Sequence, residues 1–149
     1  MTRARTLVVL AALMCLALPA IPAQAKASPT TSLINKINQV RAAHGLKALR
    51  TNRSLCRTSQ RYSRRMMQTG YFGHQARIQA SRRFKRLGEV LEWRRGHKPA
   101  VRSTVIDWLN SPGHRAVILS PSFRYIGAGL TRGRFRGRRA GIWVAQLGR

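Results

Sequence analysis

The chain has 149 residues, of which 29 are Lys or Arg and three are Asp or Glu, so its formal net charge at pH 7 is +26. This length suits one domain with its own hydrophobic core, and two cysteines are too few for a disulfide-rich scaffold. The charge predicts anionic partners, which a basic protein attracts through a long-range, salt-sensitive field.

The first 25 residues have the pattern of a signal peptide. Arg3 and Arg5 precede an apolar run over residues 7–18, and residues 23–25, Ala-Gln-Ala, form a small-x-small cleavage pattern. A run of about twelve apolar residues is too short for a membrane anchor, which needs about twenty. We therefore expect a secreted, extracellular protein.

Cleavage near Ala25 would leave a short linker over residues 26–31 and one domain over residues 32–149. The mature chain would then contain no transmembrane segment and keep Cys56 alone, which excludes an intrachain disulfide. Since Cys56 lies on an apolar helical face, we expect it to be a small buried hydrophobic residue.

Helical periodicity predicts four helices, over residues 32–44, 52–70, 77–87 and 100–110. Pro112 is expected to stop the last of them.

Strand-like alternation appears only near the end of the chain. Residues 125–130 and 142–145 alternate in this way and flank a Gly- and Arg-rich stretch at residues 133–139, which predicts an antiparallel hairpin. Helices first and strands last favour an α+β domain over a wound parallel one.

Several segments together carry a resemblance to a known family. They are residues 33–46, Gly-Tyr-Phe-Gly-His at 70–74, Gly-Glu at 88–89, residues 108–119 with Asn-Ser-Pro-Gly-His-Arg, and Ile-Gly-Ala-Gly at 126–129. In order and spacing they resemble the secreted prokaryotic type of the CAP superfamily (SCP-like extracellular domains), which includes cysteine-rich secretory proteins, antigen 5 and pathogenesis-related 1 proteins. The resemblance implies a single-domain α-β-α sandwich with a cleft on one side.

The resemblance also implies the residues of that cleft, which in the family gathers two histidines and two acids. His74, Glu89 and His114 match three of the four positions. The fourth acid is expected near Asn110 or Ser111, and neither of these is acidic. The family's set of four is therefore incomplete.

Two chemical interpretations of this cluster stay open. With His74 and His114 as ligands, the two imidazoles and the Glu89 carboxylate could hold a divalent metal such as zinc and leave a position for water. Alternatively, the three groups hydrogen-bond one another and hold the cleft together without a ligand. We expect them to converge in a strongly basic pocket that is partly roofed by the loop at residues 94–99.

Other conspicuous side chains have ordinary structural interpretations. Glu92 is expected to form a surface ion pair with a neighbouring arginine, while Asp107 is expected to point to solvent or to pair with an arginine. His97 is expected in a loop. Trp108 and Trp143 lie within apolar periodic segments and are expected in the core.

The sequence contains no nucleophile motif, so an enzyme is not the first hypothesis. We expect a secreted, monomeric binding or interaction module whose ligand is apolar or anionic, such as a lipid or a cell-envelope component. One alternative is a metal-assisted hydrolase that uses His74, Glu89 and His114. A second is a non-specific polyanion binder, because no zinc-finger spacing or RNA-binding signature indicates specific nucleic-acid recognition.

Overall fold

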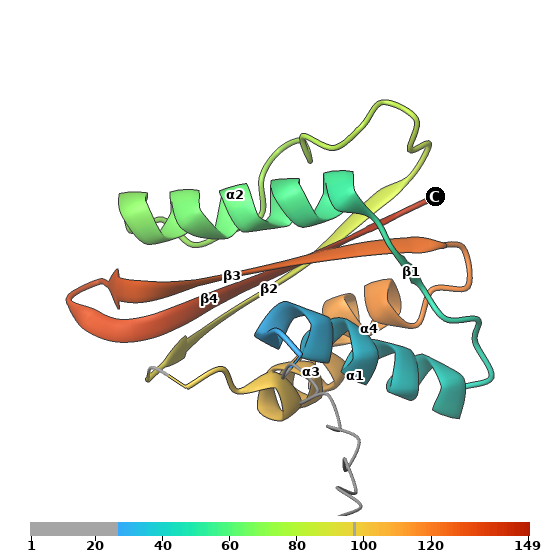
Figure 1. Cartoon of the computed structure of the whole chain (residues 1–149), viewed down its shortest axis with the longest axis horizontal. Coiled ribbons are helices and arrows are strands. Elements are labelled where there is room, and N and C mark those ends of the chain that lie inside the picture. The colour runs from blue at the N-terminus through green and yellow to red at the C-terminus, as the bar shows by residue number, and fades with distance from the viewer. Residues whose placement is uncertain (1–26, 97) are drawn as a thin grey trace, which may run out of the picture.

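A computed structural model describes residues 27–96 and 98–149 (Figure 1). The predicted signal peptide and His97 lie outside the described residues. In chain order the elements are α1 (Pro29–Ala43), β1 (Arg50–Thr51), α2 (Arg53–Thr69), β2 (Leu87–Arg95), α3 (Val101–Asn110), α4 (Pro112–Ile118), β3 (Tyr125–Phe135) and β4 (Arg138–Gly148).

The strands form one mixed sheet with the order β1-β3-β4-β2. β3 and β4 pair antiparallel from Tyr125↔Gly148 to Phe135↔Arg138, which confirms the predicted hairpin and lengthens both of its strands. At the turn, Arg136 and Gly137 both have positive φ angles, as a tight hairpin turn requires. β2 is an edge strand that pairs antiparallel with β4, and the two-residue β1 pairs parallel with β3.

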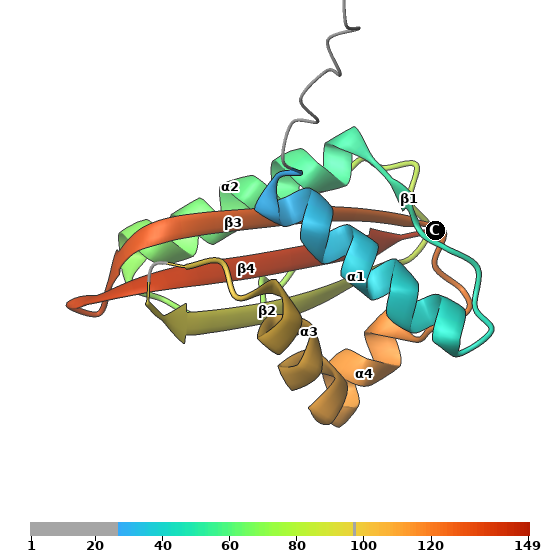
Figure 2. The ribbon, with the colours of Figure 1, turned by 60° about the horizontal axis from the view of Figure 1, so that its bottom comes forward.

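Helices cover both faces of the sheet. α2 lies along one face, while α1, α3 and α4 lie on the other (Figures 1 and 2). This arrangement is the predicted α-β-α sandwich.

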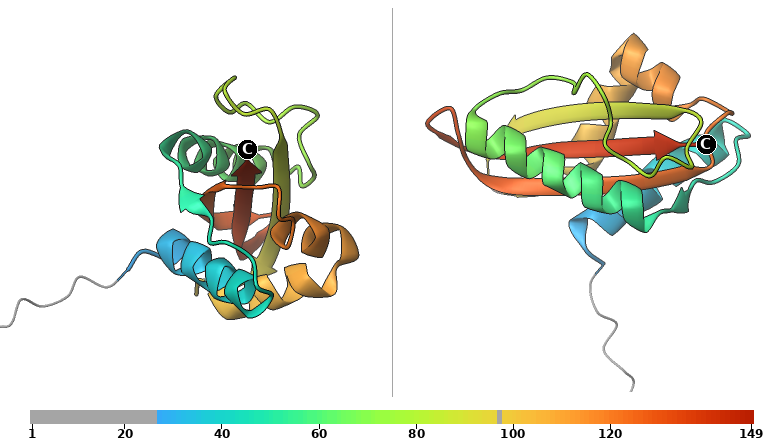
Figure 3. Two further views of the ribbon diagram at one scale, coloured as in Figure 1. Left: turned by 90° about the vertical axis from the view of Figure 1, so that its right-hand side faces the viewer. Right: turned by 90° about the horizontal axis from the view of Figure 1, so that it is seen from above.

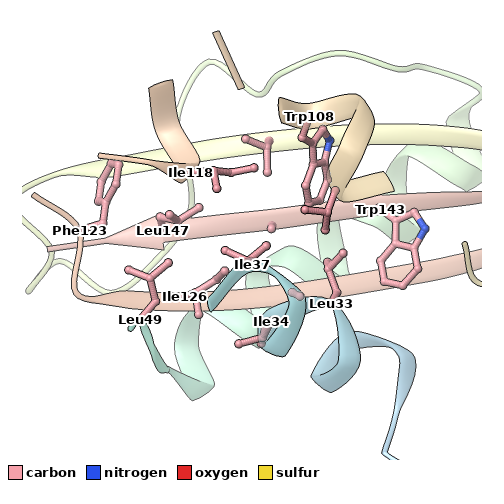
Figure 4. Packing of buried hydrophobic residues seen from close by; sticks show 14 residues of the cluster. Leu33, Ile34, Ile37, Leu49, Trp108, Ile118, Phe123, Ile126, Trp143 and Leu147 are labelled. Atoms are coloured by element: carbon pink, nitrogen blue, oxygen red, sulfur yellow. The ribbon is translucent and has the colours of Figure 1, made fainter. Parts of the chain in front are cut away.

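The larger hydrophobic core lies between the sheet and the layer of α1, α3 and α4. Leu33 and Ile37 of α1 are fully buried there against Ile126, Trp143 and other residues of the sheet (Figure 4). Trp108 is also fully buried, and its Nε1–H donates to the Leu91 carbonyl oxygen on the outer strand β2 at 2.9 Å. Both tryptophans predicted in the core are thus confirmed.

On the opposite face, α2 approaches β3 closely because two glycines leave room for it. A methyl group at Gly127 would overlap the backbone of Leu55 and Cys56, and one at Gly129 would overlap that of Ser59 and Gln60. The Gly-Ala-Gly segment at residues 127–129, which belongs to the family motifs, therefore allows the backbones of α2 and β3 to pack in direct contact.

The predicted helix over residues 77–87 is wrong. Residues 77–86 contain no α-helix, and β2 begins at Leu87. Tertiary contacts outweigh the local periodicity, because the Lys85 N–H donates to the Arg149 carbonyl at 2.7 Å and the Arg149 N–H donates to the Arg86 carbonyl at 3.0 Å. The Phe84 ring packs against Gly148, where an added methyl group would lie 2.7 Å from it. A strand therefore lies between the helices, so the order is not simply helices first and strands last.

The start of the first helix also differs from the prediction, and one further helix was not predicted. α1 begins at Pro29, within the predicted linker, because Ser28 caps it by accepting a hydrogen bond from the Thr31 N–H at 3.2 Å. The predicted stop before Pro112 is confirmed, since α3 ends at Asn110. Pro112 is also the first residue of α4, a helix that the sequence did not predict.

Candidate functional site

Glu89 is a buried hydrogen-bond acceptor on β2. Its side chain is 4% exposed and lies on the α2 face of the sheet, opposite Gln146 of β4. Oε2 accepts from Gln146 Nε2 at 2.8 Å and from Gln75 Nε2 at 2.7 Å, and Oε1 lies 3.1 Å from His74 Nδ1. Three side chains thus share one carboxylate, which has about four lone-pair positions.

This polar network extends to α2 through Gln146, which is fully buried. Gln146 Oε1 accepts a hydrogen bond from the Thr58 hydroxyl at 2.6 Å, and that hydroxyl also lies 3.1 Å from the carbonyl oxygens of Ser54 and Leu55. The network therefore connects α2, the inner strand β4, the edge strand β2 and the segment that contains His74 and Gln75.

The structure brings the three predicted side chains, His74, Glu89 and His114, into one cluster. The ring centroids of His74 and His114 lie 6.0 Å apart, with the ring planes inclined at 54°. His114 belongs to α4 in the opposite helical layer, and it reaches His74 because β2 between them is the edge of the sheet. Burial, and secondarily the neighbouring His74, lowers the pKa of His114.

The cluster does not fit a metal centre with three protein ligands. Within residues 27–96 and 98–149, no group of three or more His, Cys, Asp or Glu side chains is arranged to hold a metal ion. The hydrogen bonds agree with this, because both oxygens of Glu89 and Nδ1 of His74 are already engaged.

A cavity of about 550 Å³ opens beside His74, between α2 and the segment at residues 71–79. Tyr62 and Tyr71 contribute apolar surface, while Arg65 and Arg77 contribute positive charge. The segment at residues 71–79 forms its outer wall, and of the three predicted cleft residues only His74 lines it. Figure 3 shows the connection between α2 and β2 running beside the helix.

Tyr62 holds this wall in place, and the sequence offered no sign of its function. Its hydroxyl donates to the Gly73 carbonyl oxygen at 2.5 Å. Burial, followed by the charge of Glu89, raises the pKa of Tyr62 to about 12. The phenol therefore stays protonated and keeps its hydrogen bond over the physiological pH range.

Gln75 and Gln146 were also missed as members of the site, although each carried a signal. Gln75 directly follows His74, and Gln146 interrupts the apolar strand that ends the chain. A buried amide in such a strand needs a polar partner, which here is Glu89.

The other predicted polar residues lie elsewhere. Arg94 forms ion pairs with Asp107 and, at 3.6 Å, with Glu92, as expected for Glu92 and as one of the two alternatives for Asp107. Glu92 is partly buried, and burial together with Asp107 raises its pKa. Cys56 is half-buried at the surface of α2, whereas the sequence predicted a fully buried side chain.

Among the described helices, none combines the length and the apolar character needed to cross a bilayer.

Comparison with known proteins agrees with the fold. The profile of the CAP cysteine-rich secretory protein family matches residues 34–147. The uncharacterized protein YkwD of Bacillus subtilis (strain 168) is 29% identical over 124 residues, which are 77% of this chain and 45% of YkwD.

Two solved structures have similar folds. An outer surface protein from Borrelia burgdorferi superposes with a TM-score of 0.64 at 20% identity, covering 78% of this chain and 89% of that one. An extracellular protein containing a SCP domain from Bacillus anthracis str. Ames gives 0.64 at 21% identity, covering 81% of this chain and 40% of that one. This chain spans less than half the length of YkwD and of the B. anthracis protein. Because the family profile covers most of the chain, the protein belongs to the CAP cysteine-rich secretory protein family.

Proposed function

We propose that this protein is an exported binding module that holds an amphiphilic anion in the cavity between α2 and residues 71–79. The observation that carries the proposal is the composition of the cavity wall. Apolar surface from Tyr62 and Tyr71 lies beside the guanidinium groups of Arg65 and Arg77. An apolar body and an anionic head group match these two parts, and the volume suits a small ligand.

The hydrogen bonds of Glu89 support binding over hydrolysis. Its carboxylate connects three side chains inside the fold, so it is poorly placed to act as a general base on bound water. The acids also leave the cavity positive, since Glu92 and Asp107 pair with Arg94. A positive wall favours an anionic head group over a free divalent cation.

Equilibrium dialysis with decyl phosphate, below its micelle concentration, tests the proposal. We expect the wild-type protein to bind decyl phosphate more tightly than inorganic phosphate or decanol. The double variant Arg65→Gln/Arg77→Gln should lose at least about tenfold in affinity, since charge-assisted hydrogen bonds contribute about 1.5–3 kcal/mol each.

A matched control separates the cavity from the net charge. Arg138→Gln/Arg139→Gln removes two exposed arginines at the hairpin turn and should bind decyl phosphate like the wild type. Equal losses in the two double variants, or equal affinities for decyl phosphate and inorganic phosphate, would contradict the proposal.

Export is the second part of the proposal and rests on the pattern of residues 1–25. N-terminal sequencing of protein recovered outside the cell should start at Lys26 or an adjacent residue. Full-length protein held in the membrane with Met1 intact would contradict export with cleavage.

A further inference from the structure

The outer face of α2 carries a row of arginines that the cavity does not explain. Arg53, Arg57, Arg61 and Arg64 are all exposed and follow one another at intervals of four, four and three residues. These intervals place them on one side of a helix, along about 17 Å of its axis. We call these four residues the arginine row.

The buried residues of α2 show that the row faces solvent. Leu55, Tyr62 and Met66 are on the buried side, toward the sheet. No other helix or strand lies over the outer side of α2 in Figures 1 and 3.

No carboxylate side chain neutralises the row. The chain has three acidic residues in all, namely Glu89 and Glu92 on β2 and Asp107 on α3. Glu89 binds His74, Gln75 and Gln146, while Glu92 and Asp107 pair with Arg94. In the part of the chain that the structure describes, no side chain of the row makes an ion pair with an acid.

From this row we infer a docking surface for a linear phosphodiester polymer without bases, such as a polyol-phosphate chain of a cell envelope. Successive arginines four residues apart are separated by about 6 Å along the helix axis. Three backbone bonds of an extended chain advance about 3.5 Å, so a six-bond phosphodiester repeat advances about 7 Å. Flexible arginine side chains accommodate this small difference, and each guanidinium can meet one phosphate.

The neighbouring side chains favour this partner over two other polyanions. Single-stranded nucleic acids bind to surfaces that also offer aromatic rings for stacking, whereas the other exposed residues of α2 are Arg65, Gln68 and Thr69, none of them aromatic. Membrane surfaces usually receive an apolar face together with the charge. Among the described residues, the exposed large hydrophobic side chains are Tyr71 and Ile106, both outside α2.

The test compares two quadruple variants with the same net charge. One replaces the arginine row (Arg53, Arg57, Arg61 and Arg64→Gln), and the control replaces four exposed arginines of the hairpin (Arg132, Arg134, Arg138 and Arg139→Gln). Fluorescence anisotropy with a labelled, short poly(glycerol phosphate) chain measures affinity over a series of salt concentrations. Circular dichroism checks folding, and glutamine preserves helix propensity.

We expect the row variant to lose at least about tenfold in affinity. The slope of log affinity against log salt should become shallower by about 3, because each of the four lost phosphate contacts contributes about 0.7 to it. The hairpin variant should keep its affinity within about threefold and most of its slope. Equal losses in both variants would overturn the inference and leave net charge as the cause.

Two competition arms decide the class of polymer. An oligonucleotide with the same number of phosphates, or vesicles containing an anionic lipid, should compete more weakly than unlabelled poly(glycerol phosphate). Stronger competition by either one would overturn the assignment. Decyl phosphate binding by the row variant, measured separately, shows whether the cavity still functions.

Discussion

The two faces of the sheet differ in the polarity of their buried side chains. On the face covered by α1, α3 and α4, the core is a continuous apolar cluster around Trp108 and Trp143. On the α2 face, a smaller apolar cluster lies beside the buried network of Thr58, Gln146 and Glu89. The cavity and the arginine row are both on this second side.

We therefore assign most of the stability to the apolar face and recognition of ligands to the α2 face. The apolar face holds the layers together without directional requirements, whereas the polar face depends on specific donors and acceptors. Substitutions that alter one face at a time therefore separate the two contributions.

Gly127→Ala should be the most damaging single change. The added methyl group would overlap the backbone of Leu55 and Cys56, and overpacking of this kind costs about 3 kcal/mol. Urea unfolding measures the loss. Gly113→Ala is the matched control, since an added methyl group there meets nothing within 4 Å, and it should change stability by less than about 0.5 kcal/mol. Similar midpoints for the two variants would contradict the close approach of α2 to β3.

Glu89→Ala should destabilise the protein by about 2 kcal/mol, because the buried amide of Gln146 loses its acceptor. Glu92→Ala also removes one negative charge but takes it from a partly exposed ion pair, so its effect should stay below about 1 kcal/mol. Thermal unfolding of both variants gives the comparison. If Glu92→Ala were the more harmful, the network on the α2 face would not be the structural element we describe.

Tyr62→Phe should cost about 1 kcal/mol, the usual contribution of one hydrogen bond. It should also change the behaviour at high pH. The pKa of Tyr62 rises from 10.0 to about 12 in the fold, so the protonated phenol stabilises the native state below pH 10, and this contribution is lost as the pH rises toward 12. Unfolding measured from pH 9 to 12 should therefore show a smaller decline for Tyr62→Phe than for the wild type. Parallel declines would show that Tyr62 has an ordinary pKa.

His114→Gln should have the smallest effect, visible only below neutral pH. The pKa of folded His114 lies below the ordinary value of 6.5, so the unfolded state binds the proton more tightly. The wild type should lose stability as the pH falls below 6.5, and the variant should lose less. Nuclear magnetic resonance (NMR) titration adds a second test, because His74→Gln should raise the pKa of His114 part of the way toward 6.5.

The sequence predicted the periodic parts of this molecule well. The helices around residues 32–44, 52–70 and 100–110 and the hairpin formed largely as expected, because each has a regular apolar pattern that the sheet can bury. The helix predicted at residues 77–87 did not form, since the backbone of this segment pairs with Arg149 at the end of the chain, a partner that no local pattern reveals.

For the candidate site, the family motifs predicted His74, Glu89 and His114, and these side chains lie close together in the structure. The motifs did not indicate Gln146, Tyr62 or the wall at residues 71–79. These depend on strand register and on the path of an irregular segment, and both are consequences of tertiary packing.

We propose that ligands bind on the α2 face of the sheet and not on the apolar face. Amide NMR spectra recorded during titration with decyl phosphate test it most directly. We predict shift changes concentrated at Arg65, Tyr71, His74, Gln75 and Arg77, with α1 and α3 unchanged. Changes centred on Trp108 and the helices of the opposite face, or uniform small changes at every exposed arginine, would contradict the account.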